Sequence, residues 1–293
     1  MNGLVIVNQE LGHNKYKIER FKEEFSKHNI ALDIFVNDGS LAVIREDKID
    51  IRLPKADFVI YLDKDIYLAR ELELAGYHLF NKADFIKLCD DKTLTNIYCS
   101  GHGIRMPKTI AGPLFYSAKL KEENLTFLDD VIKELGLPLV FKKVYGSLGM
   151  GVYLAKTKEE LIDLYKQNCY LPVQFQEYIS SSYGKSMRVL IIDEEVVGGF
   201  IRYNEDDFRS NFGTHASGKK AENCDNYFEF ARQIASVLHI EYAGIDLLFG
   251  ENNEPVLCEI NSNAFFEEFE RVTGINVSEK FVNMIIKKVG HHE

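Results

Sequence analysis

The sequence predicts a mixed architecture: an amino-terminal α/β unit with a parallel sheet, followed by an α+β unit of two lobes with mostly antiparallel sheets. Two observations predict it. Through the first ninety residues or so, short apolar runs alternate with helical stretches, whereas from Lys108 onward strand patterns predominate. The length of 293 residues, with 46% hydrophobic content, suits a cored globular protein of about two domains. The expected boundaries are residues 1–90 and 91–293, the latter with lobes at about 108–175 and 176–293.

Apolar spacing predicts the elements of the amino-terminal unit. The expected strands are Leu4–Val7, Leu32–Val36 and Phe58–Leu62, and the expected helices are Lys15–His28 and Ile66–Ala75. In a parallel sheet, ligands gather at the carboxyl ends of the strands, which draws attention to Asp63 and Lys64 directly after the third strand. A solvated turn that caps the next helix explains these charges equally well.

In the second unit, strands outnumber helices. A helix is expected to open at Thr157, because Glu160 follows it at the spacing of a capping box. The other expected helices are Asp91–Ser100, Asn223–His239 and Ser278–Val289. The expected strands are Pro138–Val144, Gly151–Ala155, Val173–Phe175, Arg188–Asp193, Val196–Arg202, Gly244–Phe249 and Val256–Ile260.

The composition limits the classes of function. A formal net charge of -10 disfavours nucleic-acid binding, since a protein that neutralises many phosphates usually shows a basic face. The five cysteines are odd in number and lack the paired spacing of a zinc site or a redox dithiol, so a reducing, cytoplasmic location is expected. No apolar segment approaches the length needed to span a membrane, and no membrane partner is expected.

A glycine-rich loop, Tyr145–Gly151, lies between two expected strands, whereas Walker and dinucleotide loops lead from a strand into a helix. It is therefore expected to form a hairpin that closes over a ligand, here called the flap. Its glycines let backbone amides turn toward a phosphate without obstruction. Lys142 alternates with Val140 and Val144 on one strand face, where a charge needs a partner. An ordinary glycine turn and a solvent-reaching edge lysine are the alternatives.

The two last expected strands should pair as an antiparallel hairpin. That register places Asp246 opposite Glu259 on one face, and Asn261 follows two residues later on the same face. The carboxylates would repel one another unless a cation lay between them, and hard oxygen ligands of this kind suit Mg²⁺ or Mn²⁺. A solvated acidic hairpin without metal is the alternative, but the interleaved apolar residues favour a buried sheet.

Three arginines are expected near that hairpin. Arg188 begins one strand, Arg202 ends its partner, and Arg209 follows shortly after. Planar guanidinium groups match phosphate and carboxylate oxygens bidentately, so two arginines facing one site would clamp a phosphoryl group in transfer. Each arginine taken singly is more often part of a surface ion pair.

The order of these segments resembles ATP-grasp ligases, in particular the RimK-like branch of carboxylate–amine (glutamate) ligases. The resemblance covers about Asp91 to Val277, and the preceding residues look like the smaller amino-terminal domain of that family. It implies an ATP-grasp fold of two lobes, with ATP and Mg²⁺ as cofactors and Mn²⁺ as a substitute. The motifs that carry it are Asp91-Lys92, the lysine at 142, the flap, Gln176-Glu177-Tyr178-Ile179 and Arg209-Ser210-Asn211.

Carried over position by position, the resemblance implies a role for each matching residue. The lysines would contact phosphates, the flap would cover them, and the run from Gln176 to Ile179 would recognise adenine. The implied catalytic residues are Arg188 and Arg202, and the implied metal ligands are Asp246, Glu259 and Asn261. The implied nucleotide-binding residues are Lys92, Lys142, Gly146, Ser147, Gly149, Gly151, Gln176, Glu177, Tyr178, Ile179, Ser186, Arg209, Ser210 and Asn211.

Three departures from the family pattern leave substrate specificity open. Ser186 stands where relatives often carry an aspartate held against the ribose. After Asn211 the usual glycine pair is missing, and Ser262-Asn263-Ala264-Phe265 replaces the usual Ser-Pro-Gly start. The last two changes lie where substrates would sit, so glutamate specificity is not inherited. His215 invites a role as a base, but an ordinary loop histidine is the simpler interpretation.

The resemblance implies formation of an amide or peptide bond. ATP would activate a small-molecule carboxylate as an acyl phosphate, and an amine would displace phosphate from it. The amine acceptor would be an amino acid, a peptide or a protein tail, and a homo-oligomer is common in the family. Two rivals use the same nucleotide site: a small-molecule kinase and a non-catalytic nucleotide-binding module. The roles of Asp63, Lys64, His215 and Asn263 stay open.

Overall fold

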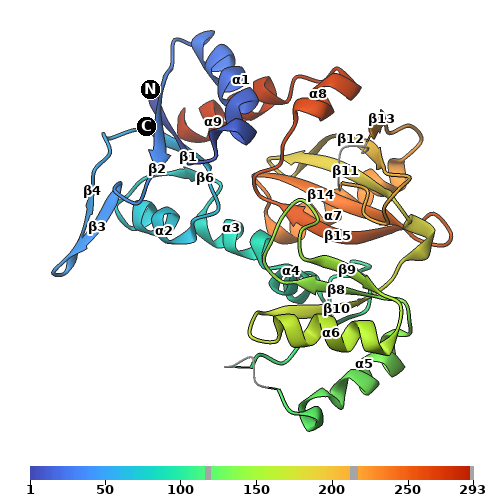
Figure 1. Ribbon diagram of the computed structural model, residues 1–293. Coiled ribbons are helices and arrows are strands. Elements are labelled where there is room, and N and C mark those ends of the chain that lie inside the picture. Colours follow the sequence, from blue (N-terminus) through green and yellow to red (C-terminus); the bar gives the residue numbers. More distant parts are fainter. Residues whose placement is uncertain (116–119, 212–216, 291–293) are drawn as a thin grey trace.

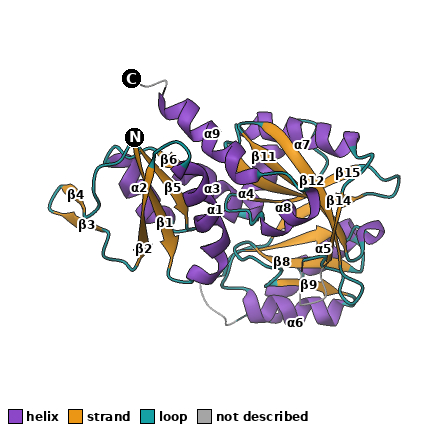
Figure 2. Cartoon of the chain, turned by 90° about the horizontal axis from the view of Figure 1, so that it is seen from above, coloured by secondary structure: helices purple, strands orange, loops and turns teal. Residues whose placement is uncertain are grey.

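The computed structural model describes residues 1–115, 120–211 and 217–290. Within these ranges the chain forms a parallel sheet at the amino end, a large antiparallel sheet beside it and a smaller antiparallel sheet below, together with a projecting hairpin (Figure 1). Figure 2 shows the same arrangement from above, with helices packed around the sheets. In the described part of the chain, no helix is both long and apolar enough to cross a membrane.

The amino-terminal sheet is parallel, as predicted. Its strands lie in the order β2 (Ala31–Asn37), β1 (Asn2–Asn8), β5 (Phe58–Leu62) and β6 (Leu79–Phe80). The interiors of β1 and β5 are buried, which explains their nearly continuous apolar runs. Helices α1 (Lys15–Ser26) and α2 (Ile66–Leu74) are confirmed. Asp65 caps α2, since its carboxylate accepts from two backbone amides of the first turn.

Several short elements in this region were not predicted. Strands β3 (Ala42–Arg45) and β4 (Lys48–Ile51) pair as the hairpin that projects from the parallel sheet in Figure 1. They are half-exposed and carry charges, so no buried face imposes an apolar alternation on their sequence. Helix α3 (Ala83–Asp90) immediately precedes α4 (Lys92–Cys99), the helix expected from Asp91.

The smaller antiparallel sheet carries the flap. Its strand order is β7 (Thr109–Ala111), β10 (Val173–Glu177), β8 (Leu139–Lys143) and β9 (Val152–Ala155), and the flap joins β8 to β9 as predicted. Helices α5 (Phe127–Leu135) and α6 (Lys158–Asn168) share an apolar cluster with these strands. The Thr157 hydroxyl accepts from the Glu160 amide, which confirms the predicted start of α6.

Among the described residues, the large antiparallel sheet has five strands. Their order is β13 (Ser217–Lys220), β12 (Glu195–Tyr203), β11 (Lys185–Ile192), β14 (Tyr242–Phe249) and β15 (Pro255–Asn261). Helix α7 (Asp225–Leu238) packs on it through the apolar side chains of Tyr227, Ala231 and Ile234. Short 3-10 turns occupy Leu11–Asn14, Glu122–Leu125 and Ser180–Ser182.

The carboxyl-terminal segment returns to the amino-terminal sheet. After β15 the chain forms α8 (Glu267–Thr273) and α9 (Val277–Gly290), and α9 lies beside α1 (Figure 1). The ring of Phe21 on α1 lies 5.7 Å from that of Phe266 and 5.0 Å from that of Phe281, measured between centroids. One apolar core therefore joins the first and last parts of the chain and holds the segment after β15 against the parallel strands.

Phe266→Ala should lower the free energy of unfolding by about 3–5 kcal/mol, because it removes a buried ring and leaves a cavity at this joint. Urea denaturation of the ligand-free protein measures the change. Tyr67→Ala on α2 is the matched control, because Tyr67 is 79% exposed. The control should shift stability by less than about 0.5 kcal/mol. Similar losses in both variants would contradict the packing at the joint.

Candidate active site

A narrow cleft of about 100 Å³ lies between the two antiparallel sheets. Val140 and Lys142 reach it from β8, and Asp246 and Leu248 reach it from β14. Val140 and Leu248 supply apolar walls, whereas Lys142 and Asp246 supply charges. Both charged residues are over nine-tenths buried, as expected for groups that have partners or ligands.

A wider cleft of about 590 Å³ adjoins the narrow one. One wall comes from the carboxyl ends of β1 and β5, through Asn8, Asp63 and Lys64. The flap and residues 262–265 after β15 provide further walls. This is the strand edge at which the parallel sheet was expected to gather ligands.

Arg202, Asn211 and Glu259 line both clefts. They come from β12, from the segment after it and from β15, so the large sheet forms the boundary. A group held at the end of the narrow cleft is therefore adjacent to a molecule in the wide cleft.

The predicted register of the last hairpin is confirmed, with Asp246 of β14 opposite Glu259 of β15. The side chain of Asn261 joins the two carboxylates: its Nδ2 lies 3.5 Å from Asp246 Oδ2 and 3.3 Å from Glu259 Oε1. The three side chains thus converge on one point, and a half-turn of the Asn261 amide would direct its oxygen there as well.

Both implied catalytic arginines contact Asp246. Arg188 binds both carboxylate oxygens through Nε and Nη2, and Arg202 Nη2 lies 2.8 Å from Oδ2. Burial alone would raise the pKa of Asp246, but the two guanidinium groups outweigh burial and lower it to about 2. Burial would lower the pKa of Arg188, and the Asp246 carboxylate raises it instead. The cationic charge expected beside this carboxylate is supplied here by arginine.

The two implied phosphate lysines occupy different clefts. Lys142 lines the narrow cleft, and Lys92 lines the wide one. Lys92 Nζ donates to the carbonyl oxygens of Val144, at 3.2 Å, and Gly146, at 2.7 Å, and so anchors the base of the flap. Burial lowers the pKa of Lys92, while the Glu259 carboxylate opposes that effect.

The flap residues divide between the clefts. Gly146 and Ser147 line the wide cleft, and Gly149 lines the narrow one. Gly151 lines neither in this structure. It has a φ of +77°, and a Cβ there would meet the Lys143 side chain, so this position requires glycine for the turn itself.

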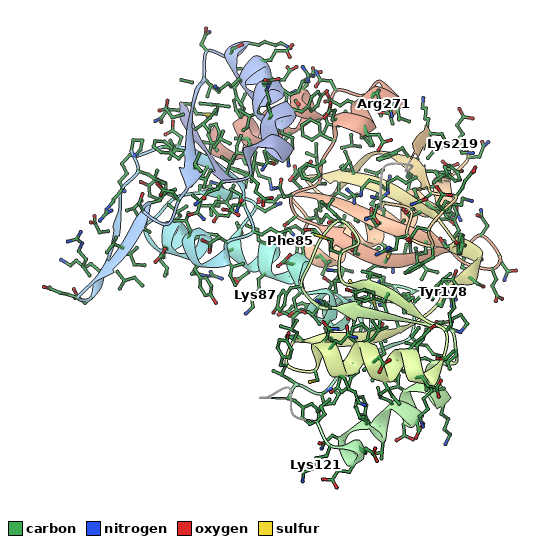
Figure 3. All side chains as sticks on the ribbon, viewed as in Figure 1. Phe85, Lys87, Lys121, Tyr178, Lys219 and Arg271 are labelled. Atoms are coloured by element: carbon green, nitrogen blue, oxygen red, sulfur yellow. The ribbon has the colours of Figure 1, made fainter. Side chains whose placement is uncertain are left out.

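The run expected to recognise adenine, Gln176–Ile179, lines the narrow cleft. The buried Gln176 donates to Thr109 Oγ1 at 2.9 Å, and the Glu177 carboxylate accepts from the Lys108 amide at 3.1 Å. Figure 3 labels Tyr178 close to where the smaller antiparallel sheet meets the large one. Its ring packs edge-on against Phe208, at 6.3 Å between centroids.

Ser186 and Ser210 form a buried hydroxyl pair in the narrow cleft, with their Oγ atoms 2.6 Å apart. Ser186 Oγ also accepts from Arg202 Nη2 at 3.0 Å. The serine that stands in place of the usual aspartate therefore orients Arg202.

Arg209 also lines the narrow cleft, but its guanidinium is bound to the flap. It donates to the carbonyl oxygens of Gly149 and Val152 at 2.9 and 3.1 Å, and it pairs with Asp207 at 2.8 Å. In this structure Arg209 therefore contributes to the position of the flap.

Three of the residues whose roles stayed open line the wide cleft: Asp63, Lys64 and Asn263. The fourth, His215, lies outside the described residues. Asp63 accepts from the side-chain amide of Asn8 at 3.2 Å, and Lys64 pairs with Asp90 at 2.6 Å. Asn8 and Asn14 line this cleft too and were not predicted. The strand-end rule that singled out Asp63 also applies to Asn8 at the end of β1.

The fold and these clefts define the ATP-grasp class, in which two lobes with antiparallel sheets enclose a nucleotide. A profile of the RimK-like ATP-grasp domain matches residues 90–285. The chain belongs to this family, whose chemistry is the ATP- and Mg²⁺-dependent joining of a carboxylate to an amine.

The chain is also similar to individual proteins, two of which are a synthase and a ligase by name. The chain is 30% identical over 248 residues to the MG012 homolog of Mycoplasma pneumoniae, an uncharacterized protein, and the match covers 84% of each. It is 31% identical over 237 residues to human N-acetylaspartylglutamate synthase A, covering 79% of this chain and 57% of the synthase. It is 31% identical over 221 residues to ribosomal protein bS6–L-glutamate ligase of Escherichia coli, covering 74% and 70%.

Solved structures share the fold. The ATP-grasp ligase PsnB, complexed with a minimal precursor, aligns with a TM-score of 0.71 at 16% identity, over 97% of this chain and 98% of PsnB. D-alanine–D-alanine ligase from Bacillus anthracis, complexed with ATP, aligns with a TM-score of 0.71 at 18% identity, over 100% and 98%.

Asp246→Asn should lower the free energy of unfolding by about 3–5 kcal/mol, because it leaves two buried guanidinium groups without their counter-charge. Urea denaturation of ligand-free protein measures the loss. Asp193→Asn is the control, since Asp193 pairs with Lys288 at a half-exposed site and should contribute under about 1 kcal/mol.

The difference in unfolding free energy between wild type and Asp246→Asn should also depend on pH. Because the pKa of Asp246 falls from 3.8 to about 2 on folding, the unfolded chain binds more protons in this window. The stabilisation is present above pH 3.8 and is lost as the pH falls toward 2, so the stability gap between wild type and variant should narrow there. A gap that stays constant over this range would contradict the ion-pair assignment.

Proposed function

We propose that this chain is a ligase that binds the adenine end of ATP in the narrow cleft, with the phosphates at the boundary of the two clefts, and joins a carboxylate to an amine in the wide cleft. The observation that carries the proposal is the shared boundary: Arg202, Asn211 and Glu259 line both clefts. A terminal phosphoryl group at that boundary would lie next to an acceptor in the wide cleft, and such proximity supplies much of the acceleration in a transfer reaction.

Cationic and acidic side chains lie together near the boundary, as a magnesium–nucleotide complex requires. Lys92, Lys142, Arg188 and Arg202 line the clefts and could contact phosphate oxygens. The carboxylates of Asp246 and Glu259 line them too and could hold the ion.

Asp246, Glu259 and Asn261 are the residues that would hold Mg²⁺. Carboxylate and amide oxygens are suitable ligands, and Asn261 contacts both carboxylates, so the three side chains meet at one point. Within residues 1–115, 120–211 and 217–290, no group of three or more His, Cys, Asp or Glu side chains is placed to hold a metal. Mg²⁺ usually takes only a few of its ligands from protein side chains, and the other ligands come from phosphates and water. When bound, the ion would neutralise charge on the phosphate oxygens.

The protein's own residues would align and neutralise the reactants. A carboxylate oxygen attacks the terminal phosphorus as the bond to ADP breaks, and the acyl phosphate forms. The amine then attacks the acyl carbon, phosphate leaves, and the nitrogen loses a proton. Arg202 is oriented for the transferred group by Asp246 and Ser186, so little reorganisation is needed. The flap, anchored by Lys92 and Arg209, would exclude water from the acyl phosphate.

The proposed substrates are a small carboxylic acid and an amino acid or peptide amine. The wide cleft, at about 590 Å³, falls in the size range of small-molecule sites. Two named relatives, the human synthase and the bacterial ligase, have glutamate in their names. L-Glutamate is therefore the first amine to test, although the departures at Asn263, Ala264 and Phe265 favour a different preference.

The test incubates the protein with ATP, Mg²⁺ and a panel of carboxylic acids, with and without L-glutamate and other amines. Formation of ADP, phosphate and an amide mass in equal amounts is expected. ADP with a phosphorylated product, but no free phosphate or amide, would point to the kinase. Tight nucleotide binding without turnover would point to the binding module.

Glu259→Ala should lower kcat by about 100-fold or more, because it removes a charge that would help hold the ion against the phosphates. The matched control is Glu251→Ala, on the exposed turn between β14 and β15, which should keep wild-type turnover. Steady-state release of ADP measures both. Unimpaired turnover in Glu259→Ala would remove this carboxylate from the proposed site.

A further inference from the structure

Lys17 is a buried lysine whose ammonium group contacts uncharged partners. Its side chain, on α1, is 1% exposed. It donates to Asn263 Oδ1 and, at 3.3 Å, to the Ala264 carbonyl oxygen, and Nζ lies 5.1 Å from the centroid of the Phe265 ring. Burial lowers the pKa of Lys17 to about 7. A buried ammonium group facing uncharged partners is costly, so these contacts have to offset a large loss of hydration.

All three residues that Lys17 contacts line the wide cleft. Asn263 is fixed at both ends of its side-chain amide, because its Nδ2 also donates to the carbonyl oxygen of Leu62 at 2.9 Å. Leu62 is the last residue of β5, so the amino-terminal unit holds Asn263 from two directions, through Lys17 on α1 and through the end of β5.

The backbone of the same loop is held at two further points. Asn81 Nδ2 donates to the Ser262 carbonyl oxygen at 2.7 Å and to the Tyr242 carbonyl oxygen at 2.8 Å. Tyr242 Oη donates to the Ala264 carbonyl oxygen at 2.7 Å. Asn81 and Tyr242 are buried, so these bonds are protected from competition with water.

We infer that Lys17 is a positioning residue for the proposed ligase reaction, which fixes the loop Ser262–Phe265 in the conformation that binds substrate in the wide cleft. Without the ammonium group, Asn263 Oδ1 loses a donor and Phe265 loses the cation near its ring. The loop then gains alternative conformations, although Asn81 and Tyr242 still hold its backbone.

Only the kinetic part of this inference rests on the proposed ligase function. The structural part is tested without substrate, by hydrogen–deuterium exchange of ligand-free Lys17→Met. Methionine fills a similar volume and removes the cost of burying an ammonium group. Amides in a peptide covering 261–268 should exchange about tenfold faster than in wild type, because the loop opens more often. A peptide covering the flap, 145–151, should be unchanged.

Lys22→Met is the matched control, because Lys22 lies on the same helix with its side chain exposed. It should leave exchange in both peptides at the wild-type rate. Tyr242→Phe is a second variant in case Lys17→Met does not fold. It removes a single hydroxyl from the Ala264 carbonyl and should speed exchange in the same peptide by a smaller factor.

The kinetic arm uses the carboxylate and amine that yield an amide in the panel. Lys17→Met should raise the KM for the carboxylate about tenfold, with the KM for ATP within about twofold of wild type, because the loop lines only the wide cleft. A purely structural lysine would change the melting temperature and leave exchange at 261–268 and both KM values alone, and that result would overturn the inference. Failure of the wild type to form any amide refutes the proposed function, while the exchange result still decides whether Lys17 fixes the loop.

Discussion

The antiparallel register of β14 and β15 is the constraint on which the rest of the site depends. It sets Asp246 and Glu259 opposite each other and brings Asn261 to the same face. A one-residue slip of β15 against β14 would turn Glu259 and Asn261 away from Asp246, to the side of the sheet where α7 packs and the apolar cluster lies. The apolar residues that alternate with these polar residues therefore set the register of the strands, and the register places the polar side chains at the site.

That register has an electrostatic requirement. Asp246 is almost fully buried, and it remains ionised because Arg188 on β11 and Arg202 on β12 reach it across the sheet. The acid thereby orients both arginines, and Ser186 adds a further contact to Arg202. A carboxylate that holds two guanidinium groups in place makes a rigid cationic surface at the boundary of the clefts, with Glu259 left to face both of them.

The amino-terminal unit has two structural roles at this site. The ends of β1 and β5 form a wall of the wide cleft, and α1, β5 and the residue after β6 hold the loop that follows Asn261. The return of α9 to α1 makes this arrangement stable, because it buries Phe266 and Phe281 in a core shared with the parallel strands. The wall of the wide cleft and the fold of the two chain ends are consequently linked through one loop.

The sequence by itself determined the parallel and antiparallel sheets, the flap between β8 and β9, the start of α6 at Thr157 and the pairing of Asp246 with Glu259. Each of these follows from local spacing: apolar periodicity, a capping pattern or the register of one hairpin. The half-exposed hairpin β3–β4 was not predicted, because no buried face imposes an apolar alternation on its sequence. Only the tertiary structure decided that Arg188 and Arg202 share Asp246, that Arg209 holds the flap, and that Lys17 reaches a loop some 246 residues further along the chain. These contacts join segments from different sheets and from opposite ends of the chain. A local sequence pattern cannot identify such partners, because only the packing of distant segments brings them together.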